Sequence, residues 1–406
     1  MSQQILVLDC HAHTLTVMRS LSAAGYQTTL GVTKEELDQG FVHASRFVTT
    51  TWQHPDIIDE PGAFDAALLS FLGQNPQYKL IFPVGENSVR KLADIRDEIP
   101  GDIVIAMPDN DAVNTCLHKP SAYQVAEKCQ IPTPGTKTII SKEELRTAVN
   151  ELGFPSIVKA SDSTSLLLGK KCVFVRSQAD LKELADNWPG GEEKFVVQNE
   201  IRGKRFNCDI VAEKGQLRLY FESEILRTDQ PDYAGNSVYD RSIAPNPVHR
   251  KYCEQLVNEL NYTGVALIQF LNDEKTGNSY FIEANPRAGS TVALPVHCGM
   301  DLPSECVRAC TGGSSRVDQS YPVGQSQNWL HGDLLGLRKA RMNREVSIMG
   351  SLLWIAQAFA DFLRADCHTT FVWKDPKPTM LLYWHLLARI FFKQARGSAR
   401  KAHDST

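Results

Sequence analysis

Short apolar runs alternate with helical patterns through the first hundred residues, and this alternation constrains the fold more than any other feature. Residues 5–8, 80–84 and 103–106 are apolar runs of strand length, and residues 15–24 have helical spacing. Strands that alternate with helices along a chain usually lie parallel in one sheet, which the helices cover. The sequence therefore predicts an N-terminal parallel α/β domain, which we place over residues 1–108.

The pattern changes beyond a proline-rich break, Ile-Pro-Thr-Pro-Gly. Strands and helices first alternate, but residues 206–226 and 264–284 contain strands in succession, as in antiparallel sheets. A chain of 406 residues has room for two or three domains. We predict a two-lobed α+β domain over residues 109–318, with a small lobe at about 133–202, and a mainly helical extension over residues 319–406.

Composition and charge exclude several classes of protein. The net charge is −4, with 43 basic and 47 acidic residues, which lacks the positive excess typical of nucleic-acid-binding proteins. The first residues have no signal-peptide pattern, and no uncharged apolar run reaches the ~20 residues that span a bilayer.

The turn after the first strand contains no glycine, which disfavours a dinucleotide site. Cys306 and Cys310 are spaced for one helix face but lack two further zinc ligands. We predict a cytoplasmic protein with reduced thiols and no nucleic-acid partner.

Polar side chains gather on two apolar strands in the second half of the chain. Gln269 lies in the first strand, and Glu283 and Asn285 lie two residues apart in the second. Side chains alternate along a strand, so Glu283 and Asn285 share a face, and Gln269 can lie opposite them on the neighbouring strand. Oxygen ligands on one face suit magnesium, and Arg287 beyond the strand end could hold a transferring phosphoryl group. A strand with a polar solvent face is the alternative explanation.

The segment Ile-Glu-Ala-Asn-Pro-Arg-Ala at 282–288, preceded by Ile-Gln-Phe at 268–270, resembles the metal-binding strands of the ATP-grasp superfamily. The likeness is greatest to the synthetase domains of carbamoyl phosphate synthase. It implies ATP as cosubstrate, and it implies that Gln269, Glu283 and Asn285 bind Mg²⁺, or Mn²⁺ in its place. It also implies a pre-ATP-grasp N-terminal domain followed by a two-lobed ATP-grasp domain.

Two lysines upstream fit the same family. Lys119 opens the segment His-Lys-Pro-Ser-Ala-Tyr, and Lys159 ends the strand Gly-Phe-Pro-Ser-Ile-Val-Lys. Either lysine alone would be read as a surface residue. Because both lysines occur in motifs that resemble those of the family, the resemblance implies that both hold the phosphates of ATP.

The segment Val-Val-Gln-Asn-Glu-Ile-Arg-Gly at 196–203 resembles the hinge that receives adenine. The resemblance assigns nucleotide contacts to four hinge residues: Gln198, Asn199, Glu200 and Ile201. The family's phosphate-covering loop is rich in glycine, whereas residues 161–171 contain one glycine, so Lys170 or Lys171 would have to cover the phosphates. Asn199 and Arg205 stand where the family usually has acidic residues. This departure affects the contacts that the family's acidic residues would make with the ribose of ATP.

The substrate site is expected between the N-terminal sheet and the central strands. Arg227, before the loop 229–240, could bind a substrate carboxylate, and an ordinary surface arginine is the equal alternative. Glu222 and Glu224 are further candidates on the same strand. His11, His13 and Glu86 follow strand ends, where open α/β sheets bind ligands, but plain turn residues are the more common explanation.

The C-terminal extension has its own pattern. Residues 351–363 and 379–392 are apolar with helical spacing, and the stretch from Arg389 carries five basic residues. Such a helix can lie in the interface of a membrane, at its cytoplasmic face. Packing on its own domain or on a second copy, in a homo-oligomer, is the more common alternative.

The resemblance to the ATP-grasp superfamily implies that the protein is a carboxylate-amine ligase. Its substrates would be a small-molecule carboxylate, activated as an acyl phosphate, and an amine. One alternative is an enzyme that phosphorylates bicarbonate or another small acid, as carbamoyl phosphate synthase and biotin carboxylase do. A second alternative is an ATP-binding regulatory subunit without catalysis.

Overall fold

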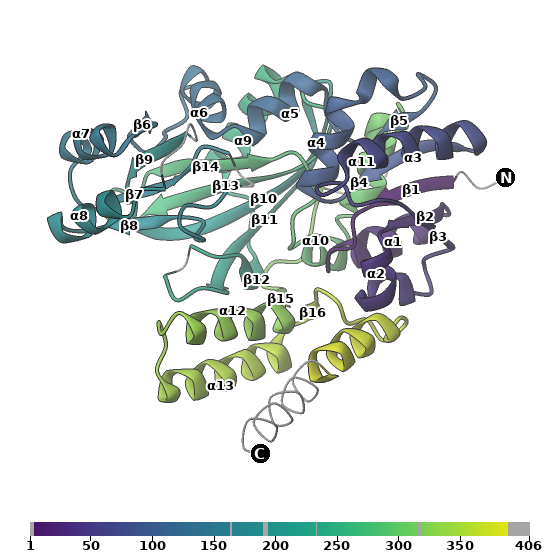
Figure 1. The fold of residues 1–406 in the computed structure, drawn as a ribbon. Helices are drawn as coiled ribbons and strands as arrows, with labels where there is room; N and C mark the ends of the chain where they lie inside the picture. The colour runs from purple at the N-terminus through teal and green to yellow at the C-terminus, as the bar shows by residue number, and fades with distance from the viewer. Residues whose placement is uncertain (1–3, 163–164, 190–193, 233, 316–318, 389–406) are drawn as a thin grey trace, which may run out of the picture.

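The computed structural model describes residues 4–162, 165–189, 194–232, 234–315 and 319–388, and arranges them around three sheets (Figure 1). The N-terminal sheet and the small four-stranded sheet lie toward opposite sides of the molecule. The seven-stranded sheet fills the space between them, and the C-terminal helices lie at one end. The site residues lie on the large sheet and on the segments that face it.

The N-terminal sheet has five parallel strands in the order β3-β2-β1-β4-β5, as the alternating pattern predicts. Its strands are β1 (Gln4–Leu8), β2 (Gln27–Val32), β3 (Thr50–Gln53), β4 (Tyr78–Pro83) and β5 (Val104–Ile105). Its helices are α1 (Thr14–Ala23), α2 (Lys34–Gln39), α3 (Pro61–Gln74) and α4 (Glu86–Asp94), with short 3-10 turns at Val42–Ala44 and Arg96–Glu98. The sequence analysis missed β3, because this edge strand is polar and mostly exposed, which leaves no apolar run.

Helices α5 (Asn110–Leu117) and α6 (Lys119–Lys128) lead from this domain into the small lobe. The small lobe is an antiparallel sheet in the order β6-β9-β7-β8. Its elements are β6 (Thr136–Ile139), α7 (Lys142–Leu152), β7 (Ser156–Ala160), β8 (Val173–Val175), α8 (Gln178–Asp186) and β9 (Phe195–Asn199). The two helices share one apolar core with the sheet, so this lobe buries its own hydrophobic residues.

The large sheet has seven strands in the order β14-β13-β10-β11-β12-β15-β16. Its first five strands in chain order are β10 (Gly203–Glu213), β11 (Gln216–Thr228), β12 (Ser237–Ser242), β13 (Gly264–Asp273) and β14 (Ser279–Asn285). Helices α6 and α9 (Pro247–Glu259) share a core with one face. The N-terminal domain, α10 (Ala293–His297) and α11 (Leu302–Cys310) share a core with the other face. The second face carries the candidate site.

The C-terminal extension is less separate than the sequence analysis predicts. Two of its segments, β15 (Ser326–Asn328) and β16 (Cys367–His368), extend the large sheet beyond β12. Helices α12 (Leu330–Met342) and α13 (Ile348–Arg364) form a hairpin, and a further helix runs from 377 to 388. None of the described helices combines the length and apolar character needed to cross a membrane.

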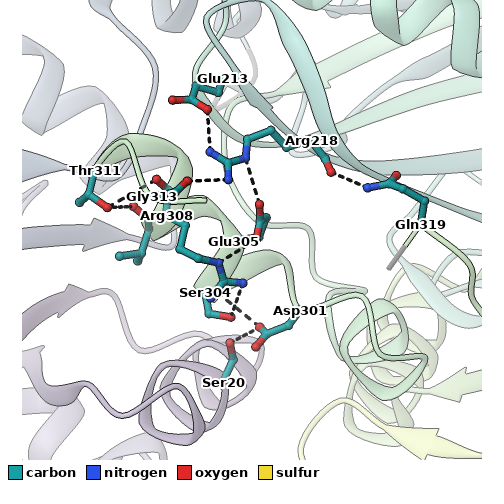
Figure 2. Close-up of polar contacts among 11 residues, drawn as sticks. Ser20, Glu213, Arg218, Asp301, Ser304, Glu305, Arg308, Thr311, Gly313 and Gln319 are labelled. Carbon is teal, nitrogen blue, oxygen red and sulfur yellow. Dashed lines mark hydrogen bonds and ion pairs between the residues drawn. The ribbon is translucent and has the colours of Figure 1, made fainter. Parts of the chain in front are cut away.

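A buried ion-pair network fastens α11 to the large sheet (Figure 2). The carboxylate of Glu305, fully buried, accepts from Arg218 of β11 at 3.0 Å and from Arg308 at 2.8 Å. Arg218 also binds Glu213 at 2.6 Å. Paired charges of this kind tolerate burial, whereas removal of one partner leaves the others uncompensated. The network therefore helps to hold the N-terminal domain, which α11 contacts through α1, against the sheet.

Candidate active site

The three predicted metal ligands lie together on the face of the large sheet that looks toward the N-terminal domain. Gln269 of β13 is in register with Glu283 of β14, and Asn285 follows on the same face beside Leu267. The Asn285 amide donates to Glu283 Oε1 at 3.0 Å, which directs the amide oxygen of Asn285 away from that carboxylate. One carboxylate and two amide oxygens on adjacent strands form a donor set that fits a hard divalent cation such as Mg²⁺.

A β-bulge in β14 gives this face its polar character. The register shifts between Gln269 and Phe270, so that Phe270 pairs with Phe281 while Gln269 pairs with Glu283. Both phenylalanines are fully buried in the core on the opposite face. Ile282 is the additional residue, and it changes the phase of the alternation. The bulge therefore places an apolar side chain and a carboxylate, two residues apart, on opposite faces of the sheet.

Lysine side chains surround the Glu283 carboxylate. Burial raises the pKa of Glu283, but the Asn285 hydrogen bond and the charges of Lys119, Lys171 and Lys159 outweigh it, so the pKa lies below its usual value. Burial and the charge of Lys159 lower the pKa of Lys119 to about 8. These lysines come from α6, from β7 and from the loop after β7. The arrangement gathers positive charge around one carboxylate, as a polyphosphate site requires.

Tyr123 of α6 organises this cluster, although the sequence analysis gave it no role. Its hydroxyl donates to the Ile282 carbonyl at 3.0 Å, and the Lys159 ammonium donates to the same hydroxyl at 3.1 Å. Burial lowers the pKa of Lys159, but Tyr123 and Glu283 outweigh it, so Lys159 remains protonated. The only sequence signal for a role of Tyr123 is its position in the motif that contains Lys119, because the contacts of Tyr123 depend on the tertiary fold.

The two lysines of the loop predicted to cover the phosphates have different partners. Lys170 is about half exposed, and its ammonium pairs with Glu345, between α12 and α13, at 3.3 Å. Lys171 donates to Asn236 Oδ1 at 2.8 Å and contributes to the field at Glu283. Of these two lysines, Lys171 is the one whose charge acts on Glu283, and phosphate contact by either lysine stays a prediction. Residues 163 and 164 of the same loop lie outside the described residues.

The hinge residues lie at the end of β9 and just beyond it. The Gln198 side chain donates to Thr136 Oγ1 at 2.7 Å, and the Asn199 side chain donates to a carbonyl of α7 at 2.9 Å. The backbone N–H of Glu200 donates to the Pro155 carbonyl at 3.1 Å. These contacts shape the hinge from within the small lobe, and Ile201 continues it as a half-buried residue. Their assignment to nucleotide binding stays a prediction.

Arg205 lies in the site rather than at its edge. It projects from β10, and its guanidinium donates to Gln269 Oε1 at 3.1 Å and to the Gly235 carbonyl at 3.0 Å. Burial lowers its pKa, whereas the Glu283 carboxylate raises it. The sequence analysis treated Arg205 as a departure at a ribose contact. The structure instead joins this residue to the metal-ligand set.

Arg287 and the first βα turn approach each other across the domain boundary. His13 is half-buried, and desolvation, His11 and Arg287 lower its pKa well below the usual value, so the ring is neutral. The rings of His11 and His13 stack with centroids 5.4 Å apart. Glu86 opens α4, and its side chain accepts from Arg90 at 2.9 Å. The charge of Arg287 thus acts on His13, and a role of either histidine in ligand binding stays a prediction.

Arg227 and Glu224 have structural partners in place of the substrate contacts predicted for them. The Arg227 guanidinium binds both oxygens of Asp333 in α12 and donates to Asp361 in α13 at 2.8 Å. Arg227 therefore fastens the C-terminal helices to β11, and this corrects its assignment as a catalytic residue. Glu224 accepts from Lys204 at 2.8 Å on the other face of the sheet.

Glu222 also lies on the opposite face, within a buried hydrogen-bond network. Its carboxylate accepts from the Tyr220 hydroxyl at 2.7 Å and from the Asn246 backbone at 2.7 Å, and it pairs with His249 at 2.6 Å. Cys208 lies close enough to form a metal-binding group with Glu222 and His249. Because these contacts already satisfy the carboxylate, the network is explained as core structure.

Residues 116–291 match a family model described as ATP-grasp domain. A relative, the carbamoyl phosphate synthase large chain of Lachnoclostridium phytofermentans, is 30% identical over 177 residues, which are 42% of this chain and 16% of that protein. This chain thus spans a small part of the length of that relative.

Solved structures share the fold over a larger part of the chain. The biotin carboxylase domain dimer of Hydrogenobacter thermophilus 2-oxoglutarate carboxylase, with MgADP and bicarbonate, aligns with a TM-score of 0.65 at 18% identity, covering 80% of this chain and 73% of that one. An ADP complex of N5-carboxyaminoimidazole ribonucleotide synthetase aligns with a TM-score of 0.63 at 14% identity, covering 80% of each chain. At these identities, the likeness describes the fold.

Proposed function

Because residues 116–291 form an ATP-grasp domain, we propose that the protein is an ATP-dependent ligase that activates a carboxylate as an acyl phosphate and couples it to an amine. The observation that carries this proposal is the donor set of Gln269, Glu283 and Asn285 beside two half-buried lysines, Lys119 and Lys159. Such a set suits magnesium and the phosphates of ATP at one position.

The chain's own residues divide the chemistry between them. Lys119, Lys159 and Lys171 would hold the phosphates, and the hinge would receive adenine. The proposed metal ligands, Gln269, Glu283 and Asn285, would hold Mg²⁺. A metal ion held by them would neutralise the phosphate charge that shifts during transfer. Mn²⁺ would fit the same oxygen donors.

The proposed reaction has two steps. A carboxylate oxygen attacks the γ-phosphorus, and the bond to the ADP oxygen breaks, while Arg287 stabilises the charge on the transferring group. An amine nitrogen then attacks the acyl carbon and loses a proton, and the bond from that carbon to the phosphate oxygen breaks. The products are an amide, ADP and phosphate. Closure of the small lobe would keep water from the acyl phosphate.

The test is magnesium-dependent ADP release by the full chain, screened over carboxylates and amines singly and in pairs. The proposal expects release that depends on one carboxylate together with one amine. Release with bicarbonate alone would favour the small-acid alternative. Nucleotide binding without turnover for any pair would favour a regulatory subunit and contradict the proposal. An Asp186→Asn variant, altered at an exposed carboxylate of α8, controls for handling.

We also propose that the C-terminal extension contacts the surface of an anionic membrane at its cytoplasmic face. Exposed apolar side chains follow one face of α13 at helical spacing: Ile348, Met349, Leu352, Leu353, Phe359 and Leu363. Trp384 and Leu387 of the neighbouring helix are also exposed. Figure 1 shows both helices at the same end of the molecule. The sequence from 389 onward carries five basic residues and lies outside the described residues. An apolar helix face that is followed in the sequence by basic residues is typical of segments that bind a negatively charged lipid surface.

Vesicle flotation tests this contact. The full chain should float with vesicles of phosphatidylcholine and phosphatidylserine, and less with phosphatidylcholine alone. Leu353→Glu with Leu363→Glu should abolish flotation, whereas Glu254→Gln, at an exposed site on α9, should preserve it. A chain that does not float and is dimeric by light scattering would contradict this proposal and assign the face to a second copy.

A further inference from the structure

A row of buried polar side chains continues from the metal-ligand set across the large sheet. Gln269 donates to Asn207 Oδ1 of β10 at 2.8 Å, and Asn207 is in register with Ser223 of β11. Asp209 lies two residues further along β10, on the same face. Asp240 of β12 lies two residues from Ser242, which is the register partner of Ser223. The row thus crosses three adjacent strands on the face that carries the metal ligands.

This row contains polar atoms that have no hydrogen-bond partner within the described part of the chain. They are both carboxylate oxygens of Asp209, Oδ2 of Asp240, the Ser223 hydroxyl and the side-chain nitrogen of Asn207. Asp209 and Asp240 are each 1% exposed, and Ser223 is fully buried. Buried polar groups are nearly always hydrogen-bonded, and an unpaired buried carboxylate opposes folding strongly. Several such groups in one row indicate a site whose partner is a ligand.

The loop after β14 passes close to Asp209. A Cβ atom at Gly289 would lie 3.2 Å from Asp209 Oδ1 and 2.9 Å from a methyl group of Leu267. Glycine at this position therefore leaves the carboxylate oxygen uncovered. The Thr291 hydroxyl, in the same loop, is also buried without a partner among the described residues. The same loop begins at Arg287, so it borders the proposed reaction site as well.

The chemistry of the row favours a ligand that donates hydrogen bonds and carries positive charge. Three of its unpartnered atoms are carboxylate oxygens, which accept hydrogen bonds when ionised. Burial raises the pKa of Asp209 to about 7, and burial with the nearby Asp209 charge raises that of Asp240 to about 8. A cationic partner would restore the ionised carboxylates. A carboxylate substrate would instead meet like charge here.

We propose that Asp209, Ser223 and Asp240 form the subsite that binds the amine nucleophile. This inference rests on the proposed ligase function and names the substrate class that the row would bind. The amine would arrive as an ammonium ion and pass one proton to Asp209. Its nitrogen lone pair would then form the C–N bond, while the bond from the acyl carbon to the phosphate oxygen breaks, and the nitrogen's second proton would leave with the phosphate.

Thermal unfolding of the full chain without ATP tests the subsite, with methylammonium chloride as the probe. Tetramethylammonium chloride is the matched control, because it has the same charge and no N–H donor. The wild type should show a saturable rise in Tm of a few degrees with methylammonium alone. Equal responses to both salts would overturn the proposal, as would a response to calcium chloride in place of methylammonium.

Two variants separate binding from structure. Asp209→Asn should abolish the methylammonium response, yet its Tm without the probe should equal or exceed that of the wild type, because an unpaired buried charge is removed. Gly289→Ala should weaken the response by covering the same oxygen, which keeps the test valid if Asp209→Asn misfolds. Asp186→Asn should respond as the wild type does. An unchanged response in both site variants would overturn the proposal.

The methylammonium test of the subsite can succeed or fail whether or not the protein is a ligase. The response to methylammonium is measured without nucleotide, so a chain that never releases ADP can still show the subsite. Conversely, the wild type could turn over ATP with an amine while Asp209→Asn keeps the same KM for that amine. That result would support the ligase function and overturn the proposed subsite. The expected change is at least a tenfold rise in the KM for the amine, with the KM for ATP unchanged.

Discussion

The affinity for ATP should fall above about pH 8, because Lys119 loses its charge there. Burial and the neighbouring charge of Lys159 lower the pKa of Lys119 to about 8. One pH unit above the pKa, about one lysine in ten is still protonated, so affinity falls about tenfold if only the ammonium binds phosphate. That loss corresponds to about 1.4 kcal/mol. Below the pKa, Lys119 is charged and its contribution to affinity is constant.

Isothermal titration with MgATP from about pH 7 to about pH 9.5 would measure this dependence of Kd. Lys119→Arg should remove the inflection, because a guanidinium stays charged throughout this range. Lys142→Arg, at the exposed start of α7, should keep it. A wild-type affinity that is constant to the top of this range would refute the reasoning. So would an inflection that survives in Lys119→Arg.

Two further substitutions test the contacts that hold the site together. Glu305→Ala should lower the free energy of unfolding by about 3–5 kcal/mol in urea titrations, because Arg218 and Arg308 would keep buried charges without their shared partner; a loss below about 1 kcal/mol would contradict this role. Tyr123→Phe should cost about 1 kcal/mol of stability and weaken MgATP binding severalfold, because Lys159 loses the hydroxyl that orients its ammonium; an unchanged Kd would remove Tyr123 from the site.

The shared face of Gln269, Glu283 and Asn285 could be predicted from sequence because its geometry is local. The three residues lie in two strands joined by a short hairpin, and side chains alternate along a strand, so Glu283 and Asn285 share a face. The bulge at Ile282 could not be predicted in this way. Strict alternation would put Phe281 on the face of Glu283, whereas the structure buries it in the opposite core. The prediction of a shared face is confirmed because Glu283 and Asn285 both follow the bulge, whereas the binding of Mg²⁺ by these residues stays a prediction.

The residues that sequence reasoning misplaced have partners far along the chain. Arg227 pairs with Asp333 and Asp361, which are 106 and 134 residues away in the sequence, so no local pattern predicts these ion pairs. The buried row of Asp209 and Asp240 depends in the same way on the register of three strands. Each of these residues reads alone as an ordinary polar position in a strand. Their roles become visible only when the sheet brings them together.

Transfer of an ¹⁸O label from the carboxylate to the released phosphate would show that the carboxylate is activated as an acyl phosphate. The full chain would be given MgATP, the amine and an ¹⁸O-labelled carboxylate from the pair that supports ADP release. The account predicts one ¹⁸O atom in the released phosphate at each turnover, and no release by Glu283→Gln, which lacks the carboxylate of the metal set. Unlabelled phosphate, or label in AMP, would contradict it.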